Sequence, residues 1–160
     1  MKNPSDATTG FEPEFIAGLK LMFEERIAFN KVLGMQITGI APERVGCRIA
    51  MRPELVGNFH STRIHGGVIS SVLDALGGLA VLAAVSARHL DEAIPQRLQR
   101  FAKLGTIDLR VDYLRPGIGE HFDATATALR AGSRVGTARM DFHDPAGKLI
   151  ATATGAYILS

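Results

Sequence analysis

The fold is decided by the stretch IHGGVISSVLDALGGLAVLAAV, residues 64–85. Between Val68 and Val85 the strongly polar side chains are Ser70, Ser71 and Asp74. A run this apolar predicts a helix that is buried on nearly every side and ends near Arg88. An unpaired carboxylate costs several kcal/mol to bury, so such a helix neutralises it, pairs it or uses it. We expect Asp74 to be used.

Composition limits the class of protein. With 160 residues, 46% apolar and 21% charged, the chain predicts one ordinary globular domain. The net charge is only +2 and no block of five Lys or Arg occurs, which argues against a nucleic-acid partner. The single cysteine, Cys47, excludes an internal disulfide and a Cys-rich zinc site, and the histidines lack metal-ligand spacing. We therefore expect no metal and no cofactor.

The ends of the chain and the apolar run bear on its location. Residues 1–10 are polar and predict a flexible arm rather than a signal peptide, with a single domain over residues 11–160. The apolar run is at the lower length limit for a membrane span, and Asp74 and the Gly77-Gly78 pair interrupt it. We expect a soluble, cytoplasmic protein with no membrane partner.

Hydrophobic periodicity gives the remaining elements. Residues 12–30 predict an amphipathic helix that ends near Gly34, and residues 53–63 predict a loop. Residues 91–103 predict a short basic helix or connector with Pro95 in its first turn. Period-two alternation predicts strands at 35–40, 45–52, 106–114, 122–130, 134–143 and 148–159, with a type I turn at 144–147.

Short turns between these strands favour an antiparallel sheet wrapped around the long helix, an α+β arrangement. One sheet would leave such a helix half uncovered, and a second copy packed against it would cover the rest. The pattern therefore predicts a homodimer.

Several motifs together resemble a known family. Asn58, His65-Gly66-Gly67 and Asp74, followed by TIDLRVDYLRP at 106–116, resemble the hotdog-fold acyl-CoA thioesterases of the PaaI-like group. The amino-acid sequence at residues 56–58 and 65–69, together with the basic connector at 91–103, is most similar to the YigI-like branch of this family. The resemblance covers residues 34–159. It implies a hotdog fold with an extra N-terminal helix, dimers with a continuous sheet that can pair into tetramers, and hydrolysis of acyl-CoA.

The same resemblance assigns roles to four residues. Gly66 matches the family's oxyanion amide, and Asp74 matches its general base or nucleophile. Asn58 matches the residue that orients water or the carbonyl, and Thr106 matches a hydroxyl position that is often Ser. The chain departs from the pattern in that Thr at 106, and in a gap from Asn58 to His65 that is one residue longer.

The chemistry can also be argued from the residues alone. Thioester hydrolysis needs donors for the oxyanion and a carboxylate that activates water or attacks directly. Gly66 and Gly67 at a helix start offer bare backbone N–H groups. Gly66 and Asp74 are separated by about 12 Å of helix at 1.5 Å per residue, whereas catalytic groups come within roughly 3 Å of the reacting atoms. If both act, two antiparallel helices must place each Asp74 opposite Gly66 of the partner subunit.

Further residues are candidates for substrate binding. His65 and Gly67 lie at the helix start, where His65 suits a capping or loop-fixing role better than proton transfer. Arg115 and Arg134 follow turns and can meet the CoA phosphates, although solvated surface arginines show the same pattern. Small residues leave room beside the helix and favour a fatty acyl tail over an aromatic one: Gly77, Gly78, Ala80, Ala83 and Ala84. We expect the substrate to be a medium- or long-chain acyl-CoA.

Two alternatives stay open. A hotdog hydratase or dehydratase acts on the same thioesters, but it usually needs a paired His and carboxylate, which no motif here supplies. A ligand-sensing hotdog domain would hold acyl-CoA without cutting it; it would be expected to lack Asp74 or to carry a DNA-binding region.

Overall fold

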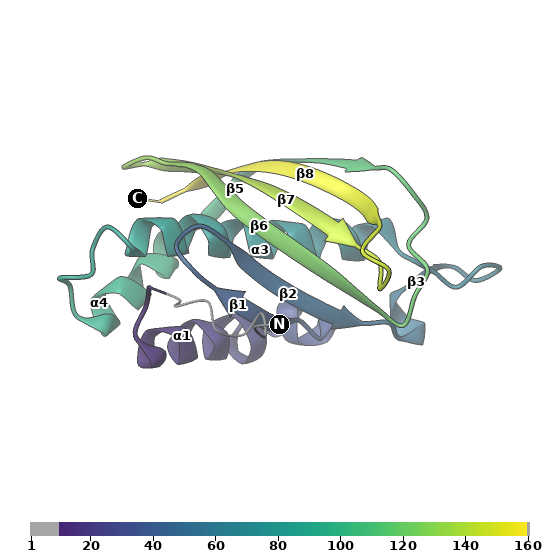
Figure 1. The fold of residues 1–160 in the computed structure, drawn as a ribbon, viewed down its shortest axis with the longest axis horizontal. Helices are drawn as coiled ribbons and strands as arrows, with labels where there is room; N and C mark the ends of the chain where they lie inside the picture. Colours follow the sequence, from purple (N-terminus) through teal and green to yellow (C-terminus); the bar gives the residue numbers. More distant parts are fainter. Residues whose placement is uncertain (1–9, 160) are drawn as a thin grey trace, which may run out of the picture.

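The computed structural model describes residues 10–159 and shows a curved sheet that encloses one long helix (Figure 1). All pairs of neighbouring strands are antiparallel, in the order β1-β2-β6-β7-β8-β5. The strands are β1 (Gln36–Ile40), β2 (Val45–Ala50), β5 (Gly105–Tyr113), β6 (His121–Ala131), β7 (Val135–His143) and β8 (Leu149–Ile158). The predicted α+β hotdog architecture is confirmed. Of the predicted arm, residues 1–10, only Gly10 lies within the described residues.

The strands follow the alternation of the sequence. In β2 the side chains of Val45, Cys47 and Ile49 are buried, and the residues between them are more exposed. The turn between β7 and β8 closes with a hydrogen bond from the Gly147 N–H to the Asp144 carbonyl at 2.9 Å, as a β-turn over 144–147 requires. Strands β1 and β5 form the two edges of the sheet.

The central helix α3 (Gly66–Ser86) lies along the inside of the sheet, and it ends two residues earlier than expected. Leu73, Leu76 and Leu79 have no exposed surface. By length and mean hydropathy (2.1) α3 would pass as a membrane span, but 67% of that window is buried inside the fold. The prediction that this helix is buried on nearly every side is wrong for the single chain, because one stripe of α3 is only half-buried: Ser70, Ser71, Asp74 and Ala75.

The N-terminal helix is not continuous. It consists of α1 (Pro13–Lys20), the π-helical segment η2 (Leu21–Arg26) and α2 (Ala28–Leu33). Ile27 has extended backbone angles (φ −78°, ψ 100°), and its N–H reaches back five residues to the Met22 carbonyl at 3.0 Å. The continuous helix predicted over 12–30 is therefore wrong at Ile27. Its end is correct, since Gly34 caps α2 in the left-handed region with φ 71°.

Two connections differ in how well the sequence predicts them. The predicted loop at 53–63 contains a helical turn, η3 (Pro53–Leu55), and a hairpin of β3 (Val56–Asn58) and β4 (Arg63–Ile64). These strands are too short to show a period. The connector is confirmed as α4 (Ile94–Gln99) and η4 (Arg100–Lys103), with Pro95 in the first turn.

The connector is tied to the N-terminal helix by one buried side chain. Arg97 is fully buried, and its Nη2 contacts Glu12 Oε1 at 2.5 Å. Its guanidinium also lies 4.5 Å from the centre of the Phe15 ring. This contact holds α4 against α1, on the side of α3 that the sheet leaves open.

Candidate active site

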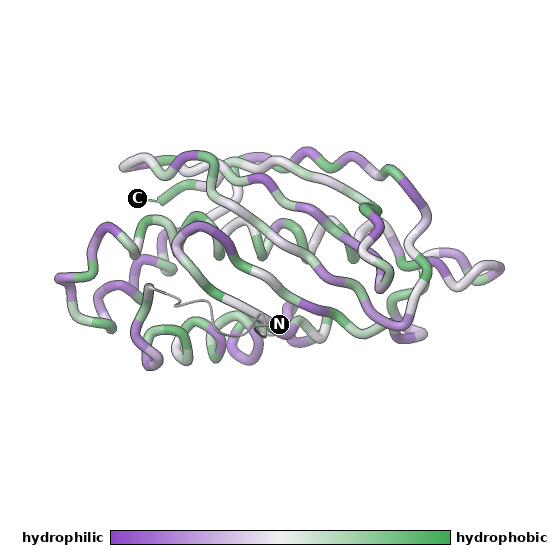
Figure 2. The backbone as a smooth tube through the Cα atoms, viewed as in Figure 1, coloured by the Kyte–Doolittle hydropathy of each residue, from purple (hydrophilic) through white to green (hydrophobic). Residues whose placement is uncertain are grey.

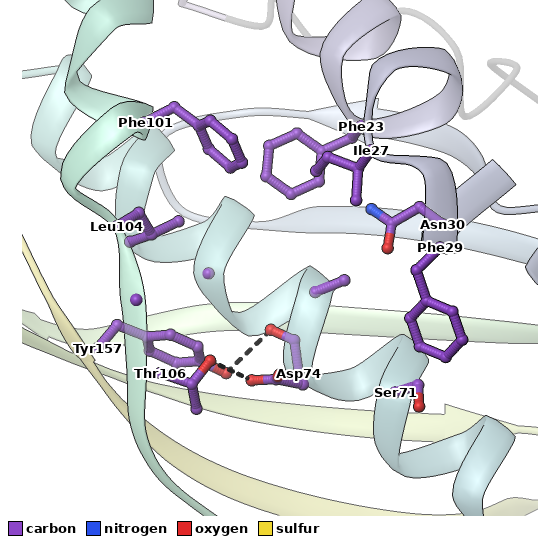
Figure 3. Close-up of a pocket in the computed structure, with 13 residues that line it drawn as sticks. Phe23, Ile27, Phe29, Asn30, Ser71, Asp74, Phe101, Leu104, Thr106 and Tyr157 are labelled. Atoms are coloured by element: carbon purple, nitrogen blue, oxygen red, sulfur yellow. Dashed lines mark hydrogen bonds between the residues drawn. The ribbon is translucent and has the colours of Figure 1, made fainter.

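Asp74 lies two turns into α3 and is held by a residue from β5. The Thr106 hydroxyl donates to Asp74 Oδ1 at 2.8 Å (Figure 3). The carboxylate remains half-buried, so it can be approached from outside the helix. The structure therefore brings together Asp74 and Thr106, two of the four predicted catalytic residues.

A second residue, Tyr157 of β8, fixes the same turn of α3. Its hydroxyl donates to the Asp74 carbonyl oxygen at 3.1 Å. A Cβ at Gly77 would lie 2.1 Å from that hydroxyl, so only glycine allows the tyrosine so close. Burial, with the nearby Asp74 charge, raises the pKa of Tyr157 well above its usual value. Tyr157 is not among the residues predicted from the sequence, although a glycine in the middle of a helix, Gly77, is a signal of close approach.

Asp74 opens onto a largely apolar cavity of about 250 Å³. Its walls come from η2, α2, α3, η4, β5 and β8, and Figure 3 shows Phe23, Phe101 and Leu104 gathered on one side. The polar side chains in the lining are Asn30, Ser71, Asp74, Thr106 and Tyr157. A carboxylate at the edge of an apolar space suits chemistry on a polar bond attached to an apolar group.

The start of α3 leaves one backbone donor free. His65 Nδ1 accepts from the Gly67 N–H at 2.8 Å, which confirms the capping role predicted for His65. The N–H groups of Val68 and Ile69 donate to the His65 carbonyl at 3.0 and 3.2 Å. Among the described residues the Gly66 N–H has no partner, and the positive end of the helix dipole lies behind it.

Asn58 lies on the Gly66 side of the site. The His65 N–H donates to the Leu55 carbonyl at 2.8 Å, which fixes the β3–β4 hairpin beside the helix start. The Asn58 side chain is exposed, and its Oδ1 accepts from the His60 N–H at 3.0 Å. Figure 1 shows this hairpin projecting beyond the sheet.

The two arginines proposed for CoA lie at opposite ends of β8. Arg115 donates to the Leu149 carbonyl at 3.0 Å, where β8 begins. The Arg134 carbonyl accepts from the Leu159 N–H at 2.8 Å, where β8 ends. One chain therefore does not bring Arg115 and Arg134 together.

The room expected beside the helix is mostly filled. Tyr157 occupies the space at Gly77, and Ala80 and Ala83 are buried in the core. Of the five small residues, only Gly78 lines the cavity. The space for a ligand comes instead from the broken N-terminal helix and from η4, which hydropathy alone did not indicate.

The candidate residues thus form two separate groups, or half-sites. One is Asp74 with Thr106 and Tyr157; the other is the Gly66 amide with Asn58, where the Tyr113 hydroxyl holds the Gly66 carbonyl at 2.9 Å. About 12 Å of helix separates Gly66 from Asp74. Within residues 10–159 no cluster of three or more His, Cys, Asp or Glu is placed to hold a metal ion.

The fold is that of the hotdog proteins, and a half-buried carboxylate facing an apolar cavity is what a thioesterase of this class would require. The model of the Thioesterase superfamily matches residues 62–151. The medium/long-chain acyl-CoA thioesterase YigI of Escherichia coli (strain K12) is 41% identical over 138 residues, covering 86% of this chain and 89% of that protein. The chain belongs to the thioesterase superfamily.

Solved structures agree with this assignment. A thioesterase-superfamily protein from Shewanella oneidensis has a TM-score of 0.86 and 40% identity, covering 94% of this chain and 100% of its own. The zebrafish thioesterase superfamily member 2 has a TM-score of 0.70 at 23% identity, covering 89% of this chain and 96% of its own, and shows the shared fold.

Proposed function

We propose that the protein hydrolyses medium- to long-chain acyl-CoA thioesters to a free acid and CoA. The observation that carries the proposal is Asp74, held by Thr106 at the edge of an apolar cavity. The likeness to YigI, whose name specifies medium/long-chain acyl-CoA, supports the substrate class. We also propose that the enzyme is soluble and cytoplasmic. The long apolar helix α3 is 67% buried inside the fold, which supports a soluble protein.

In the proposed reaction, the acyl chain enters the cavity and places its thioester carbonyl beside Asp74. Asp74 removes a proton from water as the oxygen attacks the carbonyl carbon, or it attacks that carbon itself to form an anhydride that water then opens. The negative charge that develops on the carbonyl oxygen is stabilised by the Gly66 N–H. In the first route the carbon–sulfur bond breaks when the tetrahedral intermediate collapses; in the second it breaks as the anhydride forms, before water opens it. In both routes the CoA thiolate leaves and takes up a proton.

The two half-sites are proposed to meet across a homodimer. If two α3 helices cross near residue 70, each Asp74 faces Gly66 and Asn58 of the partner subunit. The half-buried stripe of α3 is free for this contact, and edge strand β5 has no neighbour on its outer side within the described chain. Ile107 and Tyr113 on β5 are 55% and 53% exposed, which supports pairing of β5 with its copy. Pairing of such dimers into tetramers remains a prediction.

Substrate contacts follow from the same crossing. His65 and Gly67 form the helix start that would face the thioester. Arg115 follows β5, whose Tyr113 hydroxyl contacts Gly66 at the start of α3, which supports a role for the Arg115 guanidinium in binding a CoA phosphate. Arg134 lies at the far end of β8 and is the weaker candidate for the same role.

The test is thiol release from acyl-CoA esters of increasing chain length, with Asp74→Asn compared with the wild type. Asp91→Asn makes the same chemical change at an exposed position after α3 and serves as the matched control. Burial raises the pKa of the Cys47 thiol to about 12, so the protein itself does not contribute to the thiol readout.

We expect Asp74→Asn to lower kcat by at least about a hundredfold and Asp91→Asn to leave it unchanged. Near-normal turnover by Asp74→Asn on every ester would exclude the assignment. Binding of acyl-CoA without any thiol release by the wild type would favour the sensor, and a product that retains the thioester would favour a hydratase.

A further inference from the structure

Asn30 places an unpartnered hydrogen-bond donor in the wall of the cavity. The residue is 3% exposed, and its Nδ2 has no hydrogen-bond partner among residues 10–159. The residue lines the same space as Asp74, and Figure 3 shows its amide directed into the cavity, across from Thr106 and Tyr157. A buried donor left unsatisfied is costly, so native proteins usually pair such a group with protein, water or ligand.

The backbone is arranged to present this amide. The π-helical segment η2 ends at Arg26, and the chain restarts at Ala28 as α2, two residues before Asn30. The Asn30 carbonyl is engaged separately, because it accepts from the Met35 N–H at 3.1 Å. Single-turn π segments inside helices are frequent at functional sites. The side-chain amide is therefore free to bind something in the cavity without a cost to the local fold.

The surroundings of Asn30 indicate where its ligand atom lies. Asp74 and Thr106 mark the end of the cavity where the thioester carbonyl is placed. Figure 3 shows Asn30 on a different wall, beside Ile27 and Phe29. In the proposed reaction the thioester lies beside Asp74, so an oxygen bound beside Ile27 and Phe29 would belong to the acyl chain.

We propose that Asn30 is a specificity-determining residue that binds an acceptor oxygen, a hydroxyl or a carbonyl, carried on the acyl chain of the substrate. The inference rests on the proposed acyl-CoA thioesterase activity and narrows its substrate class to oxygenated acyl-CoA esters. A site built to hydrogen-bond such an oxygen discriminates against the chain that lacks it, since its own buried group then stays unpaired.

The experiment compares octanoyl-, 3-hydroxyoctanoyl-, 3-oxooctanoyl- and 8-hydroxyoctanoyl-CoA, and the matching decanoyl esters. The wild type should hydrolyse at least one oxygenated ester with a kcat/KM about tenfold or more above the plain ester of the same length. Asn30→Leu, which removes the amide at similar volume, should reduce that ratio to near one. Ile27→Leu changes the neighbouring apolar wall and should leave the ratio as in the wild type.

The outcomes separate this inference from the proposed function. If no ester is hydrolysed, the proposed function fails. If esters are hydrolysed but the wild type shows no preference, or Asn30→Leu lowers kcat/KM equally for plain and oxygenated chains, the role of Asn30 in specificity is refuted. If Asn30→Leu does not fold, a wild type without preference still refutes the role, and Asn30→Ala, which also removes the amide, should reduce the ratio to near one.

Discussion

The close approach of Gly77 and Tyr157 predicts a measurable coupling between α3 and β8. Adding a Cβ at Gly77 would place it 2.1 Å from the Tyr157 hydroxyl and 2.9 Å from both Met140 Sδ and Tyr157 Cζ. Overpacking of this kind costs about 1–3 kcal/mol, offset by up to about 1 kcal/mol because alanine favours the helix. Tyr157→Phe alone should cost about 0.5–1.5 kcal/mol through the lost hydrogen bond to the Asp74 carbonyl.

The two changes should not add. With the hydroxyl gone, the worst contact of the new methyl group disappears, so the double variant should be more stable than the sum predicts by about 1 kcal/mol or more. Urea unfolding of the wild type, both single variants and the double variant measures this coupling. Protein concentration must be matched, because the proposed dimer would unfold in a concentration-dependent way.

A neighbouring glycine supplies the control for this cycle. A Cβ at Gly78 would meet Leu104 Cδ2 at 3.1 Å, the end of a flexible side chain that can shift. Gly78→Ala should therefore change stability little. Additivity of Gly77→Ala and Tyr157→Phe within about 0.5 kcal/mol would refute the reasoning, since the steric conflict would then lie elsewhere.

Two further predictions concern the groups around Asp74. Thr106→Val should lower kcat/KM by roughly tenfold on every ester, because the hydrogen bond from the exposed Thr106 hydroxyl to the Asp74 carboxylate is lost. Thr106→Ser keeps the hydroxyl and should retain activity. Equal losses in both variants would contradict the proposed role of the hydroxyl. Burial raises the pKa of Tyr157, so the unfolded state loses this proton first as pH rises above about 10, and stability should fall by up to about 1.4 kcal/mol per pH unit. Thermal unfolding between pH 9 and 11 should show a shallower fall for Tyr157→Phe, and identical slopes would argue against a buried, neutral tyrosine.

The elements with a strong period could be predicted from the sequence. The alternation of Val45, Cys47 and Ile49 has a direct physical cause, since one face of β2 lies on the core. The length and apolar character of residues 68–85 likewise required burial, and α3 supplies it. In both cases the hydropathy pattern, drawn along the backbone in Figure 2, records which residues contact the core: alternate residues in β2 and most residues in α3.

The break at Ile27 could not be predicted in the same way. The π-helical segment leaves the apolar face of residues 15–27 intact, so the sequence pattern is that of an ordinary amphipathic helix. The β3–β4 hairpin was missed for a different reason, because strands of three and two residues carry no measurable alternation. Both features shape the site, and both depend on a few backbone angles rather than on composition.

The same distinction applies to the candidate site: spacing within one helix could be predicted, and contacts between distant elements could not. The separation of Gly66 and Asp74 could be calculated from the sequence, because both lie on one helix of fixed rise. The partners of Asp74 could not, since Thr106 and Tyr157 come from strands 32 and 83 residues further along the chain. Asn30 is the extreme case. On the apolar face of a helix it looks like an isolated polar residue, and only the packing of η2, α2 and η4 against α3 turns it into a donor facing Asp74 across one cavity. The helix α3 sets the distance between Gly66 and Asp74, whereas η2, α2 and η4 line the cavity. Changes in these shorter segments would therefore alter the acyl group that is accepted and leave the proposed chemistry at Asp74 the same.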